Sequence, residues 1–316
     1  MLTEVLLLLL GFGLLIAGAN WLVEGASVLA RKFRVPDLAI GLTVVAFGTS
    51  TPELVVNIFA AIQGHHDIVF GNIIGSNNFN LYGILGIAGL ITPLVVKSST
   101  VWKEIPLSLV AMLVLLFLAN DFLMPDQQIL SRIDGIILLV LFAFFLWYVF
   151  RQMKSDVEVH RECKECSGIK TTGMIIFGLG GLIAGGRFVV VNAEALALEL
   201  GVSEKIIGLT VVAMGTSLPE LVTSVIAGIK KNNDIAIGNI IGSNIFNVFF
   251  ILGMSALIRP QVYNTAFNTD IMMVVIGTIF LFVAMFAGKR HRLDRWEAGL
   301  LLAVFTAYTV ILISKG

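Results

Sequence analysis

Two long stretches of this sequence are near copies of each other. Residues 37–93 align without a gap with residues 204–260 at a constant offset of 167, and 33 of the 57 aligned positions are identical. Short matches continue on both sides of these stretches, so the duplication covers nearly the whole chain. A chain with such a repeat is expected to fold as two similar units, which we assign to residues 1–150 and 172–316.

The apolar content of the chain predicts that both units lie in a membrane. Hydrophobic residues make up 57% of the 316 positions and charged residues 13%, against about a quarter charged in ordinary soluble domains. Runs that could cross a bilayer, which needs about 20 residues, occur at 3–24, 38–62, 68–91, 105–123, 133–150, 173–193, 205–229, 235–257, 270–288 and 296–314. We predict an all-α membrane protein with ten transmembrane helices, five in each unit.

Basic residues are distributed unevenly over the connections between these runs. The connections after the odd-numbered runs hold 16 lysines and arginines, whereas the opposite side holds Arg132, Lys205, Arg259 and Lys315. Basic residues favour the cytoplasmic side, so both termini of this multi-pass cell-membrane protein are predicted to lie outside. Five crossings is an odd number, so the second unit is expected to be inverted relative to the first. The net charge is zero and there is no basic patch, so nucleic acid is not expected as a partner.

The longest polar stretch, residues 151–171, separates the two units and is predicted to be a cytoplasmic linker. Within it, His160, Cys163 and Cys166 have a spacing that could ligate zinc. An exposed charged linker explains the same residues without a metal. Both interpretations stay open at this point.

The second and seventh runs carry the same motif in their middle. It reads GTSTPE at 48–53 and GTSLPE at 215–220. Each proline removes a backbone donor and frees carbonyl oxygens, which is tolerated at membrane depth only inside protein or beside water. Because a charged carboxylate is costly in a membrane, Glu53 and Glu220 are predicted to mark a functional site. If the turn stays near-helical, each glutamate shares its helix face with preceding hydroxyl residues, namely Thr49, Ser50, Thr216 and Ser217.

A simpler explanation of the motif is a proline kink whose glutamate is protonated or paired with Arg187. This arginine has no basic counterpart in the first unit, where Asn20 occupies the equivalent position. Pairing could therefore serve only one of the two glutamates.

The third and eighth runs carry a second repeated motif, GNIIGSNNFN at 71–80 and GNIIGSNIFN at 238–247. Its glycines allow helices to approach closely, and such helices are often only packing surfaces. Its recurrence beside the glutamate motif favours a ligand role for the serine and asparagine that lie four residues apart on one face: Ser76, Asn80, Ser243 and Asn247.

The four motif segments together offer carboxylate, hydroxyl, amide and carbonyl oxygens, without cysteine, methionine or histidine. Hard oxygen ligands favour sodium, calcium or magnesium over zinc, copper or iron. Two carboxylates balance one calcium ion or two sodium ions, so competition for one site is a simple basis for exchange. No cofactor and no obligate protein partner is indicated beside these ions and the lipid bilayer.

The motifs GTSTPEL with GNIIGSNNFN, and GTSLPEL with GNIIGSNIFN, resemble the alpha-1 and alpha-2 repeats of the cation/calcium exchanger superfamily, in its prokaryotic sodium/calcium exchanger branch. The resemblance implies a ten-helix antiporter that exchanges sodium for calcium by alternating access. It implies a calcium site made by Glu53, Glu220 and the carbonyls of Thr49 and Thr216. It also implies sodium sites made by Ser50, Ser76, Ser217, Ser243 and the carbonyls of Ala46 and Ala213.

One position departs from part of this superfamily. Asn247 stands where some prokaryotic and potassium-dependent relatives carry aspartate, so the resemblance favours potassium-independent transport. A proton- or potassium-coupled antiporter, or a cation channel, would use similar oxygens, although a duplicated chain with two buried carboxylates favours alternating access. Enzymatic activity is not expected, because the four histidines lie in or next to predicted loops and no HExxH motif occurs.

Overall fold

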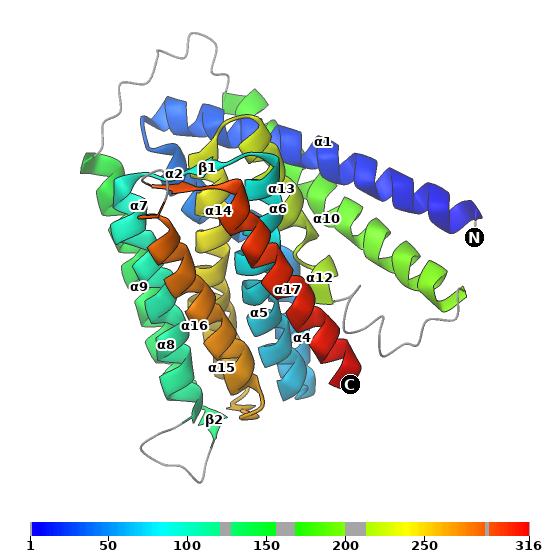
Figure 1. The fold of residues 1–316 in the computed structure, drawn as a ribbon, viewed down its shortest axis with the longest axis vertical. Helices are drawn as coiled ribbons and strands as arrows, with labels where there is room; N and C mark the ends of the chain where they lie inside the picture. The colour runs from blue at the N-terminus through cyan, green and yellow to red at the C-terminus, as the bar shows by residue number, and fades with distance from the viewer. Residues whose placement is uncertain (1, 121–127, 156–167, 200–212, 288–290, 316) are drawn as a thin grey trace.

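The computed structural model describes residues 2–120, 128–155, 168–199, 213–287 and 291–315, and nearly all of them are helical (Figure 1). The first unit contains α1 (Leu2–Phe33), α2 (Asp37–Ile40), the π-helical η1 (Gly41–Val45), α3 (Ala46–Thr49), α4 (Thr51–Gln63), α5 (His66–Asn78), the π-helical η2 (Phe79–Ile84), α6 (Leu85–Ile91), α7 (Ser98–Trp102), α8 (Glu104–Asn120) and α9 (Arg132–Ser155).

The second unit repeats this order in its described residues. It contains α10 (Gly168–Glu199), α12 (Ala213–Gly215), α13 (Leu218–Ile229), α14 (Asn233–Phe246), the π-helical η4 (Asn247–Leu252), α15 (Gly253–Ile258), α16 (Phe267–Ala284) and α17 (Arg295–Lys315). Four two-residue strands complete the fold: β1 (Leu94–Val95), β2 (Ile129–Leu130), β3 (Gln261–Val262) and β4 (Arg292–Leu293).

Seven helical segments among the described residues are long and apolar enough to cross a membrane. An eighth is added if residues 37–49 and 51–63, which meet at an angle of 49°, form one bent span. The chain is therefore a helical membrane protein, as its composition predicts. Residues 66–91 are helical too but are not among these segments, and part of the run at 205–229 lies outside the described residues. The count of ten stays a prediction.

The first helix of each unit is longer than its predicted apolar run. α1 continues to Phe33 instead of ending near residue 24, and α10 covers 168–199 instead of 173–193. The two helices lie side by side (Figure 1) and approach closely, because a Cβ atom at Gly18 would lie 2.7 Å from the carbonyl oxygen of Gly178. Hydropathy finds only the apolar part of a helix, whereas packing against a partner stabilises the polar continuation as well.

Two short strand pairs connect the first unit to the second. β1 pairs with β4, and β2 pairs with β3, both antiparallel. In the repeat alignment, β1 corresponds to β3 and β2 corresponds to β4. Each pair therefore joins a strand of one unit to the non-equivalent strand of the other unit, and the repeat relates the two pairs to each other. Figure 1 shows β1 and β2 at opposite ends of the helical bundle.

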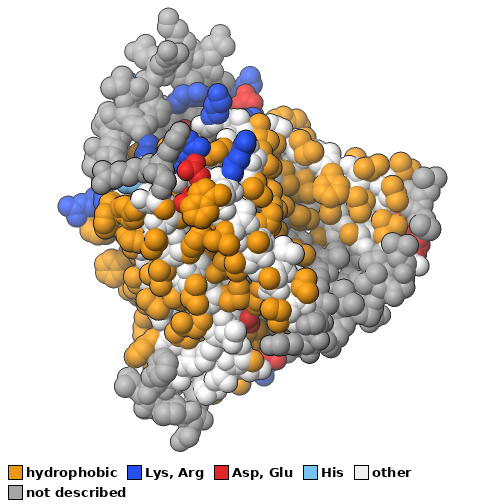
Figure 2. All heavy atoms as spheres, viewed as in Figure 1, with side chains coloured by type: hydrophobic (Ala, Val, Ile, Leu, Met, Phe, Trp, Pro, Cys, Tyr) orange, Lys and Arg blue, Asp and Glu red, His pale blue; other side chains and the backbone are white. Residues whose placement is uncertain are grey.

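Helix α14, which carries the second asparagine motif, lies in the interior, and the long helices are far more exposed. In the apolar part of residues 233–258, 94% of the residues are buried, against 28% in α1 and 17% in α17. Figure 2 shows hydrophobic side chains over the outer surface of the long helices and most of the visible lysines and arginines near one end. The buried interior is therefore the place where polar motif residues can meet away from lipid.

Candidate cation site

Both glutamate motifs lie where a helix is interrupted. Between α3 and α4, Ser50 has φ −81° and ψ 9°, and between α12 and α13, Ser217 has φ −91° and ψ 8°. A proline follows in the first turn of each new helix, where its missing N–H is not needed. Each break therefore places a glutamate, Glu53 or Glu220, in the first turn of a half-helix, at the positive end of the helix dipole.

The two glutamates are fully buried and each accepts a hydrogen bond from the other unit. Ser50 Oγ donates to Glu220 Oε1 at 2.8 Å, and Ser217 Oγ donates to Glu53 Oε1 at 2.9 Å. The sequence grouped Ser50 with Glu53 on one helix face. The structure differs because the interrupted turn directs each serine across the interface, so each motif supports the carboxylate of its repeat partner.

The two serines of the asparagine motifs complete a pair of equivalent hydroxyl contacts. Ser76 Oγ lies 2.9 Å from Ser217 Oγ and donates to Glu53 Oε1 at 3.4 Å. Ser243 Oγ lies 3.0 Å from Ser50 Oγ and donates to Glu220 Oε1 at 3.5 Å. The structure thus brings together the carboxylates and serines that the sequence singled out.

Asn80 and Asn247 are buried at the start of the π-helical segments η2 and η4. Wide π-helical turns are rare and often lie at functional sites. The amide nitrogen of Asn80 donates to Asn244 Oδ1 at 3.0 Å, and that of Asn247 donates to Asn77 Oδ1 at 3.0 Å and to Ser76 Oγ at 3.2 Å. These bonds hold both amide groups through their nitrogens, so that each amide oxygen is directed away from the group that the nitrogen binds.

Four buried acceptor oxygens of these residues have no hydrogen-bond partner within the described chain. They are Glu53 Oε2, Glu220 Oε2, Asn80 Oδ1 and Asn247 Oδ1. Buried polar atoms are nearly always satisfied, so a set of four acceptors related in pairs by the repeat needs an explanation. Carboxylate and amide oxygens are suitable ligands for calcium and sodium, which makes this set a candidate cation site.

The remaining predicted ligands border this set. Thr49 Oγ1 donates to Asn239 Oδ1 at 3.0 Å, so the hydroxyl is engaged. The Ala46 carbonyl accepts from Ser50 N at 3.0 Å and from Thr49 Oγ1 at 3.3 Å. A cation ligand role for that carbonyl therefore requires that one of these bonds be released. Ala213 is the first described residue of α12.

Sequence reasoning missed two asparagines that hold the glutamate backbones. Asn72 Nδ2 donates to Asn57 Oδ1 at 2.6 Å and to the Glu53 carbonyl at 3.5 Å, and its Oδ1 accepts from Thr216 Oγ1 at 3.4 Å. In the second unit, Asn239 Nδ2 donates to Ser224 Oγ at 2.9 Å and to the Glu220 carbonyl at 3.3 Å. The available signal was that this asparagine is identical in both copies of the motif.

Two other sequence hypotheses concern Arg187 and the linker residues. Arg187 lies on the exposed face of α10, and no ion pair joins it to either glutamate in the described chain. Pairing with this arginine therefore does not explain the buried carboxylates. The proposed zinc residues His160, Cys163 and Cys166 lie outside the described residues.

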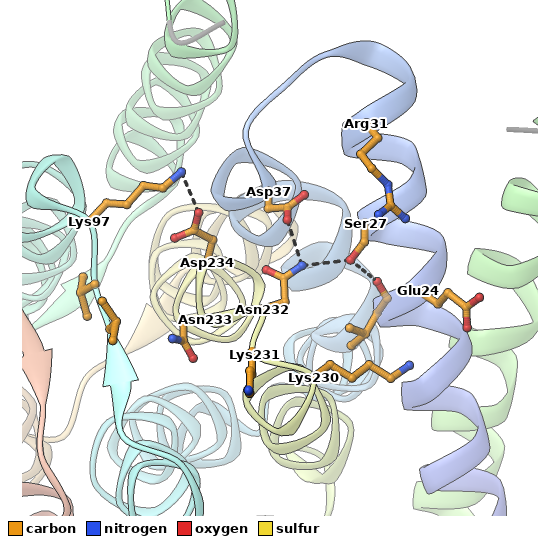
Figure 3. A pocket seen from close by; sticks show the side chains of 13 residues that line it. Glu24, Ser27, Arg31, Asp37, Lys97, Lys230, Lys231, Asn232, Asn233 and Asp234 are labelled. Atoms are coloured by element: carbon orange, nitrogen blue, oxygen red, sulfur yellow. Dashed lines mark hydrogen bonds and ion pairs between the residues drawn. The ribbon is translucent and has the colours of Figure 1, made fainter. Parts of the chain in front are cut away.

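A separate cavity of 910 Å³ lies near β1 and the start of α14 (Figure 3), and none of the candidate cation ligands is among its described lining residues. Its charged residues are partly paired: Lys97 Nζ lies 2.8 Å from Asp234 Oδ2, and Asn232 Nδ2 donates to Asp37 Oδ2 and to Ser27 Oγ, both at 2.9 Å. These contacts connect α1, α2 and β1 to the beginning of α14. We interpret them as contacts that hold this end of the bundle together.

A helical membrane protein with mirrored buried carboxylates and oxygen ligands has the features of a cation transporter. Residues 3–151 and 170–314 match the family model described as sodium/calcium exchanger protein. The chain belongs to this family, and thus to the prokaryotic branch of the cation/calcium exchanger superfamily, whose members are antiporters and not enzymes.

Similar proteins cover almost the full length of the chain. The inner membrane protein YrbG of Escherichia coli is 39% identical, with 89% of this chain and 88% of that protein covered. The sodium/calcium exchanger MaX1 of Methanosarcina acetivorans is 32% identical, with 97% of each chain covered. A solved structure of the sodium-calcium exchanger NCX_Mj, soaked with sodium and without calcium, is similar with a TM-score of 0.84, 31% identity and 98% of each chain covered.

Proposed function

We propose that this protein exchanges sodium for calcium across a cell membrane by alternating access. The observation that carries the proposal is the set of four buried acceptor oxygens that no donor in the described chain satisfies. Each unit contributes one carboxylate and one amide oxygen to it. Secondary transporters with internal repeats bind their substrate where the repeats meet, and the serine contacts between the units lie at this same position.

Charge balance supports exchange between the two ions. The two glutamates carry about two negative charges when ionised, which one calcium ion or two sodium ions neutralise. Without a cation, two like charges would remain in a buried site, which is unfavourable. The loaded forms should therefore cross between the two states more readily than the empty form, and this difference couples the two fluxes.

We assign the ions to ligands as follows. Calcium is bound by Glu53, Glu220 and the carbonyls of Thr49 and Thr216. Sodium is bound beside the same glutamates by Ser50, Ser76, Asn80, Ser217, Ser243, Asn247 and the carbonyls of Ala46 and Ala213. The paired hydrogen bonds from serine to glutamate support this grouping, because hydroxyls that now hold the carboxylates can turn their oxygens to an ion.

Alternating access is supported by the way the units exchange contacts. Equivalent strand pairs lie at opposite ends of the bundle (Figure 1), as an inverted repeat requires. We propose ten transmembrane helices in two inverted units with both termini outside. In a background with Cys163→Ser and Cys166→Ser, a cysteine at position 232 should be labelled from the cytoplasm and one at position 65 from outside. Labelling of both from the same face would contradict the inverted arrangement.

The coupling ion is tested by calcium-45 uptake into proteoliposomes. We expect uptake when an outward sodium gradient is imposed, and none when a proton or potassium gradient replaces it. Uptake that follows the proton gradient instead would overturn sodium coupling. Calcium uptake that does not depend on a gradient of sodium, protons or potassium would indicate a channel.

Transport should also be independent of potassium. Asn247 contributes a neutral amide where potassium-dependent relatives carry aspartate, so the site holds two carboxylates. A further potassium ion would bring uncompensated charge into a buried site, which is costly. Replacing potassium by choline should therefore leave sodium-driven calcium flux unchanged.

A further inference from the structure

Two further asparagines are hydrogen-bonded to the proposed ligands Asn80 and Asn247. They are Asn77 and Asn244, which occupy the same position in the two asparagine motifs and are both buried. The amide nitrogen of Asn247 donates to Asn77 Oδ1, and that of Asn80 donates to Asn244 Oδ1, both at 3.0 Å. Each unit thus supplies one asparagine that accepts a hydrogen bond from the proposed amide ligand of the other unit.

A side-chain amide has two ends of similar shape and opposite hydrogen-bonding character. Its oxygen accepts, whereas its nitrogen donates. An asparagine can therefore bind a hard cation only when its oxygen, and not its nitrogen, faces the ion. Which end faces the ion depends on the groups that the other end meets. For Asn247 these groups are Asn77 Oδ1 at 3.0 Å and Ser76 Oγ at 3.2 Å.

Of these two partners, only Asn77 can decide the direction of the Asn247 amide. The Ser76 hydroxyl can donate or accept, so it would tolerate either end of the amide. Asn77 Oδ1 only accepts. An Asn247 oxygen turned toward it would place two acceptors at the present distance of 3.0 Å. Both oxygens would then lack a donor in a buried position, which is costly.

The direction of the Asn77 amide is in turn set by a backbone carbonyl of α14. Asn77 Nδ2 donates to the carbonyl oxygen of Asn244 at 3.3 Å, and it lies 3.4 Å from the sulfur of Met112. A backbone carbonyl can only accept, and a thioether sulfur is a weak acceptor. The nitrogen of Asn77 therefore faces these two groups and its oxygen faces Asn247. One carbonyl thus determines the direction of two consecutive amides and leaves Asn247 Oδ1 as an unsatisfied acceptor.

The equivalent chain of hydrogen bonds in the other direction lacks its last bond. Asn244 Oδ1 accepts from Asn80, but no hydrogen bond joins Asn244 Nδ2 to the Asn77 carbonyl in the described chain. The Asn244 amide is therefore not held by a backbone carbonyl of the first unit. This difference makes Asn77, and not Asn244, the residue on which the direction of a proposed ligand depends most.

We propose that Asn77 is a positioning residue of the cation site. It holds Asn247 with its oxygen toward the bound ion and thereby sets the affinity for sodium relative to calcium. This role rests on the proposed function, which assigns Asn247 to sodium, whereas calcium is bound by the glutamates and the threonine carbonyls. Without the Asn77 amide, Asn247 is free to turn, so sodium binding weakens while calcium binding changes little. A residue that only held α5 against α14 would weaken both.

The role is tested by isothermal titration of the detergent-solubilised protein with calcium, first without sodium and then at several sodium concentrations, with choline keeping the ionic strength constant. The series gives the sodium concentration that doubles the apparent Kd for calcium. For Asn77→Leu this concentration should rise roughly two- to tenfold, the effect of one neutral hydrogen bond. Calcium affinity without sodium should stay close to that of the wild type. Asn77→Ala removes the same groups without adding volume and should give the same result, should the leucine variant not fold.

The matched control is Asn78→Ile. Asn78 is the next residue along α5 and is buried, and its Nδ2 donates to the Asp270 carbonyl at 3.0 Å. Its repeat counterpart is Ile245, so the chain already carries an apolar residue at this position of the motif. The control loses the same kind of bond without a contact to a proposed ligand and should keep wild-type sodium competition. An equal loss of sodium competition in the control would overturn the positioning role.

A double-mutant cycle tests whether Asn77 acts through Asn247. Asn247→Ala removes the amide that Asn77 holds. Adding Asn77→Ala to this variant should therefore weaken sodium competition no further, which makes the two single effects strongly non-additive. Additive effects would show that Asn77 acts independently of Asn247 and would overturn the proposal.

The same titrations distinguish this role from the proposed function. If sodium competes with calcium equally well in the wild type and in both Asn77 variants, the positioning role is wrong and sodium–calcium exchange stands. Equal losses of calcium and sodium affinity, together with a lower Tm in detergent, would assign Asn77 to packing alone. If sodium does not displace calcium from the wild type, the proposed exchange fails, and the role of Asn77 fails with it.

Discussion

The two asparagine-motif helices, α5 and α14, have nearly the same motif sequence but different surroundings. A Cβ atom at Gly242 of α14 would lie 2.8 Å from Leu42 Cα, whereas no atom of the described residues lies within 4 Å of one at Gly75 of α5. The repeat counterpart of Leu42, Leu209, lies outside the described residues. The same difference is found one turn earlier: a Cβ atom would lie 2.9 Å from a backbone oxygen at Gly238, but 3.7 Å from the nearest atom of the described residues at Gly71.

The hydrogen bonds around the two glutamates, in contrast, are nearly identical in the two units. Ser50 and Ser217 donate to the opposite glutamates at distances that differ by only 0.1 Å, 2.8 and 2.9 Å. Among the described residues, a symmetric binding centre is therefore combined with different packing around α5 and α14. Matched substitutions in the two repeats test whether the binding centre is symmetric and whether the packing around α5 and α14 differs.

The largest and most symmetric loss is expected from Glu53→Gln and Glu220→Gln. Each removes half of the charge that balances calcium, and loss of one partner of a buried charge pair costs about 3–5 kcal/mol, or roughly 100-fold or more in affinity. Both variants should bind calcium this much more weakly in isothermal titration and show no uptake in proteoliposomes. Glu104→Gln is the control, since it alters a buried carboxylate outside the site and should retain exchange. Wild-type uptake by either site variant would refute the central carboxylate pair.

An asymmetric effect is expected from alanine at the two motif glycines. Gly242→Ala inserts a methyl group against Leu42 and Ala46, and overpacking of this kind typically costs about 1–3 kcal/mol. Gly75→Ala adds the same methyl group at a position where no described residue lies within 4 Å, and it should cost much less. Thermal unfolding in detergent should therefore show a clear loss of Tm for Gly242→Ala and little change for Gly75→Ala. Equal losses would mean that the packing difference between α5 and α14 does not persist in solution.

The sequence predicted the symmetric part of the molecule better than the asymmetric part. Repeated motifs identified both glutamates and the serines, because polar residues in apolar runs are conspicuous and occur twice. They did not reveal that Ser50 serves Glu220, since contacts between units depend on tertiary packing and not on helix periodicity. The difference between Gly75 and Gly242 could not be predicted at all, because both lie in the same sequence, GNIIGSN.

Substitution of the asparagines that are hydrogen-bonded to the glutamate carbonyls, Asn72 and Asn239, should cause an intermediate loss of calcium affinity. Asn239→Ala removes bonds to Thr49, Ser224 and the Glu220 carbonyl, and each such bond contributes about 0.5–1.5 kcal/mol. We expect a decrease of roughly tenfold in calcium affinity by titration. Asn72→Ala should have a smaller effect, because its contact with Thr216 is longer, 3.4 Å against 3.0 Å for Thr49 and Asn239. A larger loss of calcium affinity in Asn72→Ala than in Asn239→Ala would contradict this order.

The smallest expected change, and the most informative about ion selectivity, is Asn247→Asp. The Asn247 amide oxygen is one of the four unsatisfied acceptors, so an aspartate here would add a third carboxylate beside the two glutamates. That charge favours an additional monovalent ion, and it also removes the amide donor to Asn77 and Ser76. We expect a several-fold change in sodium competition, or a new stimulation by potassium, in calcium-45 flux measured with potassium or choline.

Asn80→Asp is the matched variant, because Asn80 occupies the equivalent position and its oxygen is also unsatisfied. If the binding centre is symmetric, both variants should change sodium competition in the same direction. Flux measured at several clamped potentials adds a second readout. The wild type is expected to be electrogenic, since the family resemblance implies exchange of three sodium ions for one calcium ion. In the variants, an extra bound potassium ion would alter the charge moved per cycle. Wild-type flux that does not respond to voltage would argue for two sodium ions, which balance the carboxylates alone. No change in either variant would place Asn80 and Asn247 outside the ion pathway and restrict the centre to the glutamates and serines.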